Sequence, residues 1–186
     1  MSALLEVKVQ APLDRESIRD VVMRYCRGTD RFDADVIRNV YWPEATDNHG
    51  VFKGLAKDYV PFFMQFADVM DQMQHLVGNV LIRVNGAGAA CESYFFGYRR
   101  VRHPETGKPC DHIASGRYLD KLERRREEWR IIERDVVFDW QRNFEDSADW
   151  PLIIGGNQVT MGGRAPDDVG CKLFDGHSLT QAASLT

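Results

Sequence analysis

The sequence predicts an α+β domain, with helices from its first part packed on one face of an antiparallel sheet formed by the rest. Two observations carry this prediction. Apolar residues recur at helical spacing before about residue 70, and from Met73 the period changes to two, as in strands. Turn residues then divide the later segment into a meander, and helices collected on one face of a curved antiparallel sheet define the α+β class.

The first predicted helix begins after Asp14, which has the chemistry of an N-cap, and ends at Thr29-Asp30. Its apolar residues, Tyr25 among them, fall on one face, so that face is expected to be buried. A second, short helix is expected at about residues 34–41, where Pro43 stops it.

Residues 46–52 could form a short strand with a break at Asn48-His49-Gly50. The third predicted helix covers residues 55–70, and Pro61 inside it implies a kink or a late start near Val60. Strands with a period of two follow, separated by turns of glycine, proline or charged residues. They are predicted at residues 73–84, 89–101, 111–122 and 129–140.

We expect residues 1–141 to form this one domain, since 186 residues with 44% hydrophobic content can bury a sizeable core. Residues 142–186 contain many glycines and polar residues and show no clear period. A functional extension of this length is expected to be ordered. We therefore predict that it packs over a pocket or over a neighbouring subunit.

The formal net charge of −4 gives no reason to expect nucleic acid or an anionic membrane as a partner. No apolar run approaches the roughly 20 residues that span a bilayer, and the N-terminal residues do not have the pattern of a signal peptide. The four cysteines are scattered and form no CxxC motif. This indicates reduced thiols in a cytoplasmic protein, although the spacing permits disulfides.

An acidic residue and a histidine are the first candidates for catalysis. Asp30 closes the first helix and His75 opens the first long strand, 45 positions later, so only the fold can bring them together. A carboxylate that orients an imidazole can move a proton without a cofactor. The alternatives are a core histidine bonded to the backbone and a helix-end carboxylate bonded to its own backbone.

The predicted order of three helices followed by an antiparallel meander is typical of a known family, and so are four segments of the sequence. These segments are YCRGTD, MQHLVGNVLIRVNG, CESYFFGYRR and GRYLDKLERRREEWRIIERDVVFDW. Over residues 12–141 the chain resembles the SnoaL-like branch of the NTF2-like superfamily, which implies a cystatin-like, cone-shaped α+β barrel. Relatives include scytalone dehydratase, bile-acid 7α-dehydratase, hexachlorocyclohexane dehydrochlorinase, polyketide cyclases and γ-formaldehyde lyases of lignin-derived diaryl compounds. This superfold hosts many reactions, so the resemblance is more specific for fold than for chemistry.

Several of these relatives use an Asp–His pair, in which the histidine takes a proton and the aspartate orients it. The resemblance implies those roles for His75 and Asp30, and it places Tyr25 where the bile-acid dehydratase has a catalytic tyrosine. By spacing alone Tyr25 is a core residue whose hydroxyl could still point into a cavity. The arginine of the bile-acid enzyme has no counterpart in Phe138-Asp139-Trp140, so a bile-acid substrate is not implied.

Further residues are candidates for contact with a flat, apolar substrate, each with a plain core or surface role as the alternative. The aromatic candidates are Tyr94, Phe96 and Tyr98, which share one strand face, and Phe62, Phe63 and Phe66 in the third helix. The polar candidates are His49, His112 and Asp139. The histidines have no HxH or HExxH spacing and no glycine-rich phosphate loop is present, so we expect no metal and no cofactor.

We therefore expect a cofactor-independent lyase or isomerase that acts on a small apolar, aromatic or polycyclic substrate by Asp–His general acid–base catalysis. Water elimination and C–C cleavage with release of formaldehyde both stay open. The alternative is a non-catalytic ligand-binding or assembly module, like the transport factors and small dioxygenase subunits of the superfamily. In either case self-association would cover the outer sheet face, as a trimer in preference to a dimer.

Overall fold

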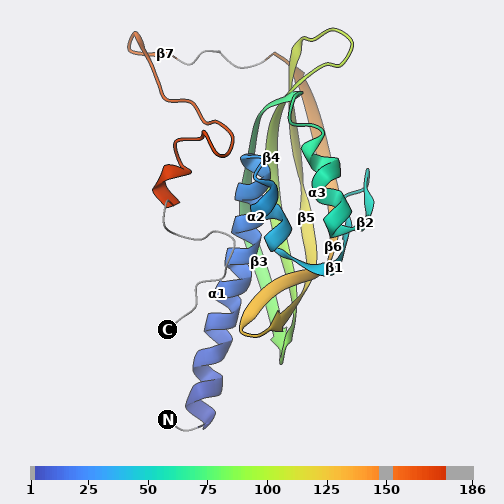
Figure 1. Ribbon diagram of the computed structural model, residues 1–186, viewed down its shortest axis with the longest axis vertical. Coiled ribbons are helices and arrows are strands. Elements are labelled where there is room, and N and C mark those ends of the chain that lie inside the picture. The colour runs from blue at the N-terminus through green and yellow to red at the C-terminus, as the bar shows by residue number, and fades with distance from the viewer. Residues whose placement is uncertain (1–2, 147–152, 175–186) are drawn as a thin grey trace.

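The computed structural model describes residues 3–146 and 153–174, with side chains from residue 10 onward. The helices precede the long strands in the chain, and short elements follow them (Figure 1). The helices are α1 (Ala3–Asp30), α2 (Ala34–Asn39) and α3 (Ala56–Met64). The strands are β1 (Tyr41–Asn48), β2 (Lys53–Leu55), β3 (Met70–Asn85), β4 (Gly88–Arg102), β5 (Pro109–Arg125), β6 (Glu128–Glu145), β7 (Ile153–Ile154) and β8 (Asn157–Gln158), and a 3-10 turn covers Lys172–Phe174.

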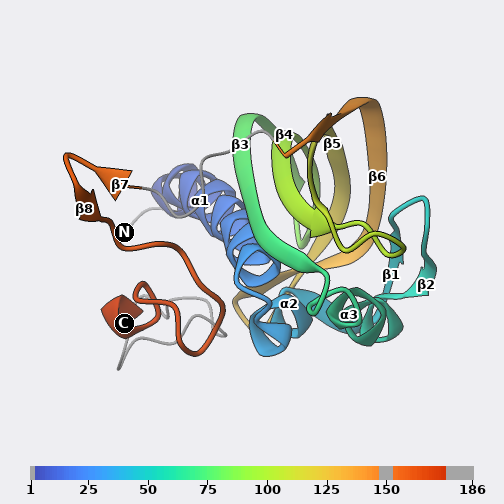
Figure 2. The ribbon, with the colours of Figure 1, turned by 90° about the horizontal axis from the view of Figure 1, so that it is seen from above.

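Six strands form one curved sheet in the order β2-β1-β6-β5-β4-β3. The long strands β3 to β6 pair antiparallel in chain order, and β1 joins them parallel to β6. Figure 2 shows the sheet curled, with α2 and α3 across its open side and α1 alongside β3. The predicted fold of three helices on a curved antiparallel sheet is confirmed, but β2 and β3 remain edges, so the sheet is not closed into a barrel.

The first helix is longer than predicted. It starts at Ala3 and continues through Pro12, so Asp14 lies inside it and is not an N-cap. The buried Asp14 carboxylate instead accepts a hydrogen bond from Trp129 Nε1 at 2.9 Å and another from Arg124 at 3.3 Å. These contacts tie the helix to the β5–β6 hairpin, which a local capping pattern cannot indicate.

The segment after α2 also differs from the prediction. The helix ends at Asn39, and residues 41–48, which include Pro43, form β1 rather than a helix end. Pairing with β6 is irregular between the start of β1 and Thr46. Pro43 fits there because the ladder needs no N–H from it.

The third helix keeps Pro61 but ends at Met64, before the predicted end. The long strands extend beyond their predicted ranges because pairing continues into the hairpins. Between β5 and β6 the turn is Arg126-Glu127, both with positive φ. Such a two-residue turn matches the twist of the strands that it joins.

The hydrophobic core lies between α1 and the concave face of the sheet. Ile18 and Val22 of α1 and Trp129 and Ile131 of β6 are almost fully buried and belong to one cluster. Apolar burial of this kind is the main favourable contribution to folding. It fixes the position of α1 against the sheet, and Asp30 is the last residue of that helix.

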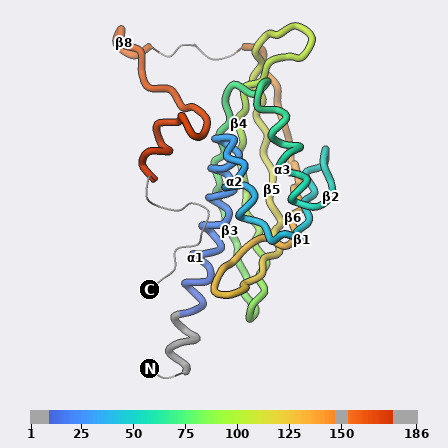
Figure 3. Tube along the Cα trace, viewed as in Figure 1, coloured from blue at the N-terminus to red at the C-terminus, as the bar shows by residue number. Residues whose placement is uncertain are grey.

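Residues 162–174 lie beside the C-terminal end of α1, whereas β7 and β8 stand away from it (Figures 2 and 3). Arg31 lies 3.4 Å from Asp168, and its carbonyl accepts a hydrogen bond from Ala165 N at 2.8 Å. None of residues 153–174 lines the cavity described below. The covering role predicted for residues 142–186 stays a prediction, and its segments 147–152 and 175–186 lie outside the described residues. Across the described ranges, no helix has the length and apolar character to cross a membrane.

Candidate active site

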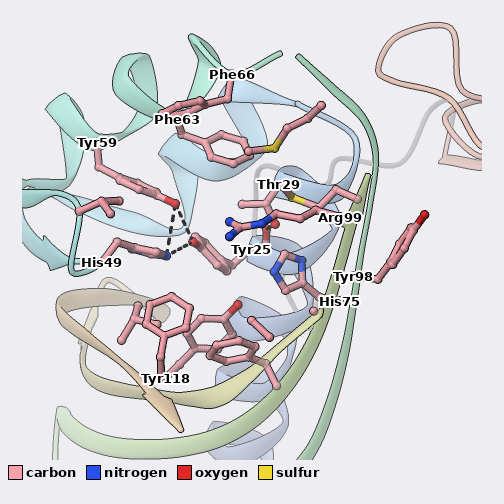
Figure 4. A pocket seen from close by; sticks show the side chains of 18 of the residues that line it. Tyr25, Thr29, His49, Tyr59, Phe63, Phe66, His75, Tyr98, Arg99 and Tyr118 are labelled. Carbon is pink, nitrogen blue, oxygen red and sulfur yellow. Dashed lines mark hydrogen bonds between the residues drawn. The ribbon is translucent and has the colours of Figure 1, made fainter. Parts of the chain in front are cut away.

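A cavity of about 330 Å³ opens on the concave side of the sheet, between α1, α3 and the long strands (Figure 4). This volume is at the lower end of the ~300–1,000 Å³ that small-molecule sites occupy. Its wall is mainly aromatic and apolar: Phe62, Phe63, Phe66, Met70, Met73, Phe95, Tyr118, Val136 and Phe138 contribute. The structure thus places Phe62 and Phe63 of α3, and Phe66 in the turn that follows it, at the cavity, and their role in binding stays a prediction.

Asp30 and His75 meet at the wall of this cavity. His75 Nδ1 donates a hydrogen bond to Asp30 Oδ1 at 2.6 Å, and the backbone N–H of His75 donates to Oδ2 at 3.0 Å. Both side chains are largely buried, and the imidazole lines the cavity. Because Nδ1–H is held by the carboxylate, Nε2 is the nitrogen that can accept a proton. The structure brings together the two residues that the sequence singled out.

A glycine gives the imidazole access to the cavity. His75 lies opposite Gly97 of β4 in the β3–β4 ladder. A Cβ atom on Gly97 would lie 3.4 Å from Cδ2 and 3.5 Å from Nε2 of His75. A glycine in a strand often marks such a close approach. The missing side chain leaves space in front of the nitrogen that would act as base.

A second Asp–His pair faces the same cavity. His49 Nδ1 donates a hydrogen bond to Asp47 Oδ1. The hydroxyls of Tyr25 and Tyr59 lie 3.0 Å and 3.3 Å from His49 Nε2, and 3.2 Å from each other. In Figure 4 this cluster stands across the view from His75. A substrate in the cavity would therefore lie between an imidazole base and a group of hydroxyls.

Burial controls the protonation of these hydroxyls. It raises the pKa of Tyr25 well above the ordinary value, with Tyr59 as the next cause. Burial also raises the pKa of Tyr59, and the carboxylate of Asp47 adds to this effect. Both tyrosines therefore stay protonated at neutral pH, and the one that does not donate to His49 Nε2 can donate a hydrogen bond to a substrate oxygen. Tyr25 and His49 were candidates by sequence, whereas Tyr59 has no signal that separates it from the core.

A buried ion pair supports the Tyr25 ring. Arg134 and Asp120 are fully buried and form two hydrogen bonds of 2.6 and 2.7 Å. The guanidinium carbon lies 3.9 Å from the ring centroid of Tyr25 and 4.4 Å from that of Tyr118. Contacts of a cation with two ring faces hold those rings in one orientation. Both charged residues occur in strands rich in charge, so the sequence gives no sign of their burial.

The structure corrects the placement of two aromatic candidates, Tyr94 and Phe96. Tyr94 and Phe96 lie on the convex face of β4, 41% and 42% exposed, and neither lines the cavity. Tyr98 reaches the rim of the cavity, but its hydroxyl donates a hydrogen bond to Asp111 at 2.7 Å. Phe95, on the other face of the strand, lines the cavity. Alternation separates the two faces of a strand but does not tell which face is concave.

Two polar candidates also lie outside the cavity lining. His112 Nε2 lies 3.1 Å from Cys110 Sγ, and Asp139 forms an ion pair with Arg117 at 3.6 Å. The side chains of His112 and Asp139 thus contact neighbouring residues of the sheet and not the cavity. In the part of the chain that the structure describes, no group of three or more His, Cys, Asp or Glu side chains could hold a metal ion.

Comparisons with known proteins give the same architecture. The fold is similar to that of hexachlorocyclohexane dehydrochlorinase LinA-type3 from Novosphingobium barchaimii LL02, at 12% identity and a TM-score of 0.67 over 78% of this chain and 99% of that chain. It is similar to a presumed scytalone dehydratase from Novosphingobium aromaticivorans DSM 12444, at 14% identity and a TM-score of 0.66 over 76% and 94%. A cystatin-like protein of unknown function from Nostoc punctiforme PCC 73102 matches at 18% identity and a TM-score of 0.56 over 68% and 92%.

At such identities the structural likeness shows the fold alone, and no curated protein matches the sequence. The family is shown by sequence. The model of the SnoaL-like domain matches residues 10–135, which run from α1 into β6 and include Asp30 and His75. This chain belongs to the SnoaL-like domain family, and its fold is of the NTF2-like, cystatin-like type.

Proposed function

We propose that this chain is a cofactor-independent lyase that uses His75 as a general base on a small, apolar, aromatic substrate. The observation that carries the proposal is the Asp30–His75 pair at the wall of an apolar cavity. Membership of the SnoaL-like family supports an enzyme that processes small molecules. Structures named as a dehydrochlorinase and a presumed dehydratase have the same fold.

In this mechanism Nε2 of His75 removes a proton from a carbon atom of the substrate. Asp30 holds the imidazole in the tautomer that leaves Nε2 free, and its negative charge stabilises the imidazolium that forms. The largely buried setting strengthens this charge interaction. General base assistance of this kind contributes about 10²–10⁴-fold to a rate.

The leaving oxygen would be received by the hydroxyls across the cavity. Tyr25 or Tyr59 gives its proton to the departing oxygen, and the proton that His75 took from the substrate returns to that tyrosine through solvent after product release, because His49 Nε2 is itself a hydrogen-bond acceptor. The electron pair of the broken C–H bond forms the new double bond, the C–O bond breaks, and the oxygen leaves as water. Base and acid therefore come from two separate clusters.

Cleavage of a C–C bond uses the same base differently. His75 would take the proton of a hydroxymethyl group, formaldehyde would leave as the C–C bond breaks, and the remaining carbanion would take up a proton. The Tyr25–Tyr59–His49 cluster favours water elimination over this reaction. It supplies the donors that a departing oxygen needs, on the side of the cavity away from the base.

A product screen by mass spectrometry tests the proposal. Aromatic alcohols, hydroxyketones and diaryl diols would be incubated with wild type, His75→Ala and His103→Ala. His103 is an exposed loop histidine and serves as the matched control. We expect a product lighter by one water from wild type and from the control, and none from His75→Ala.

Other results of the screen separate the alternatives. A product lighter by one formaldehyde would select C–C cleavage. Turnover that survives His75→Ala would exclude His75 as the base. A ligand retained without change by wild type and by His75→Ala would indicate a binding module instead of an enzyme.

A further inference from the structure

Arg99 is a cation of the cavity lining, and within residues 10–146 and 153–174 no carboxylate pairs with it. Arg99 lies on the concave face of β4, opposite Met73 of β3, and it lines the cavity. Figure 4 shows its side chain extended into the space between Tyr25, Phe63 and His75. Among the described residues, no hydrogen bond or ion pair joins the Arg99 guanidinium to a carboxylate.

The neighbouring arginines of the same strand behave differently. Arg100 contacts Asp111 at 3.1 Å and Asp146 at 2.6 Å, and Arg102 contacts Asp71 at 2.8 Å. Strand alternation places these two on the face of β4 opposite to that of Arg99. The arginines on the convex side are therefore paired with carboxylates, whereas the arginine on the cavity side has no such pair among the residues that the structure describes.

The acids nearest the cavity are engaged elsewhere. Asp30 accepts two hydrogen bonds from His75, and Asp47 accepts hydrogen bonds from His49 and from Tyr41. The described residues that line the cavity include no aspartate and no glutamate. No acidic side chain of the lining is thus available to neutralise Arg99.

A guanidinium without a counter-charge in an apolar cavity is unfavourable unless a bound ligand pairs with it. Burial lowers the pKa of Arg99, because the cavity disfavours its charge. Arginine nevertheless stays charged in proteins, and its planar group offers parallel N–H donors that match the two oxygens of a carboxylate. The cavity therefore has an apolar body for a ring and one fixed cation for an anionic group.

We propose that the substrate is an aromatic carboxylate of one or two rings, whose carboxylate pairs with Arg99 while its reacting carbon faces His75. This proposal names the substrate class for the function proposed above and rests on it. The carboxylate would also fix which end of the molecule meets the base, because Arg99 and His75 lie on neighbouring strands, β4 and β3. Positioning of this kind is a large part of catalysis.

Binding measured without turnover tests the proposal. Titration calorimetry would compare cinnamate and benzoate with their neutral amides, cinnamamide and benzamide. The proteins would be wild type, Arg99→Met, Arg99→Lys and the control Arg83→Met, which removes an exposed arginine from β3. We expect wild type and the control to bind a carboxylate about ten- to hundredfold more tightly than its amide, as for a charge-assisted hydrogen bond.

In Arg99→Met this preference should vanish while amide binding persists, which also shows that the variant is folded. Arg99→Lys should retain part of the preference, since it keeps the charge but loses the planar donors. Equal binding of acid and amide by wild type, no binding of either carboxylate, or a preference that survives Arg99→Met would overturn the proposal. His75→Ala should keep the preference for the carboxylate over the amide. The binding measurement therefore tests the role of Arg99 independently of the proposal that His75 is the catalytic base.

Discussion

Asp30 accepts two hydrogen bonds from a single residue, His75, one from the ring and one from the backbone. The Nδ1–Oδ1 distance is 2.6 Å and the N–Oδ2 distance is 3.0 Å. The end of α1 is thereby joined both to the imidazole and to the start of β3. The carboxylate fixes the ring tautomer and the position of the strand that carries the ring.

Asp30→Asn should remove the base without removing the fold. An amide at this position can accept from the His75 backbone N–H, but its NH₂ group would then donate to Nδ1. The ring proton would move to Nε2, which could no longer take a proton from the substrate. We expect kcat/KM to fall about 10²–10⁴-fold, measured on a substrate from the product screen.

The control for this variant is Asp35→Asn, at an exposed residue of α2 whose carboxylate pairs with Arg38. That variant should keep the wild-type rate. If Asp30→Asn turns over substrate as fast as Asp35→Asn does, the carboxylate does not set the tautomer of His75.

Gly97→Ala should obstruct the same imidazole from the other side. The new methyl carbon would lie 3.4 Å from Cδ2 and 3.5 Å from Nε2 of His75, which is ordinary contact and not a clash. The variant should therefore fold, but the substrate would be displaced from the base. We expect a loss in kcat/KM of at least about tenfold, since small displacements in a site reduce rates strongly.

Gly88→Ala is a matched control, because a Cβ at Gly88 meets the Asn85 carbonyl at 3.6 Å in a hairpin far from His75 in the β3–β4 register. Thermal melts should show both variants folded. Unchanged kinetics in Gly97→Ala would mean that the substrate does not approach His75 from the Gly97 side.

The fold and the Asp–His pair were accessible from the sequence for different reasons. The change of period at Met73 is local, so it predicts where helices give way to strands without knowledge of the packing. The pair is not local: residue chemistry makes Asp30 and His75 candidates, the family resemblance implies their roles, and the structure supplies the 2.6 Å hydrogen bond between them. Periodicity alone would have left His75 as a core residue.

What the sequence could not predict depends on long-range packing. Asp14 has the features of an N-cap, yet its carboxylate binds Trp129, which lies 115 positions later. Phe95 and Phe96 are neighbours of the same type, and only the direction of sheet curvature decides that Phe95 meets the cavity. Arg99 and Arg134 also look alike in sequence, and only the fold separates a cavity cation from a buried ion pair.

Asp120→Ala should destabilise the protein strongly. The substitution leaves the fully buried Arg134 without its carboxylate, and removal of one partner of a buried pair typically costs about 3–5 kcal/mol. Urea unfolding followed by tryptophan fluorescence would measure the loss. Glu133→Ala is the control, because its partner is the exposed Lys121 and such surface pairs contribute little. Similar unfolding midpoints for both variants would show that Arg134 finds another partner or solvent.

The buried thiols give a prediction for alkaline pH. Burial raises the pKa of Cys26 to about 12 and that of Cys91 to about 12, from an ordinary value of 9.0. A pKa raised in the folded state contributes stability that is complete below the unfolded value and is lost as pH rises toward the folded value. The free energy of unfolding should therefore decrease between about pH 9 and pH 12, and Cys26→Ala should make that decrease shallower.

Thiol labelling separates this effect from general alkaline unfolding. Thiolate is the reactive form, so iodoacetamide at pH 8 should leave Cys26 and Cys91 unmodified in the native protein, while the less buried Cys110 and Cys171 react first. Peptide mass mapping after a timed quench identifies the labelled sites, and labelling in urea shows that all four thiols are free. Burial causes both the raised pKa of these thiols and their protection from iodoacetamide. If the thiols are not protected, the predicted loss of stability at alkaline pH should therefore be absent as well. Rapid native labelling of Cys26 would mean that the α1 face opens locally, and the predicted slope between pH 9 and 12 would then be absent.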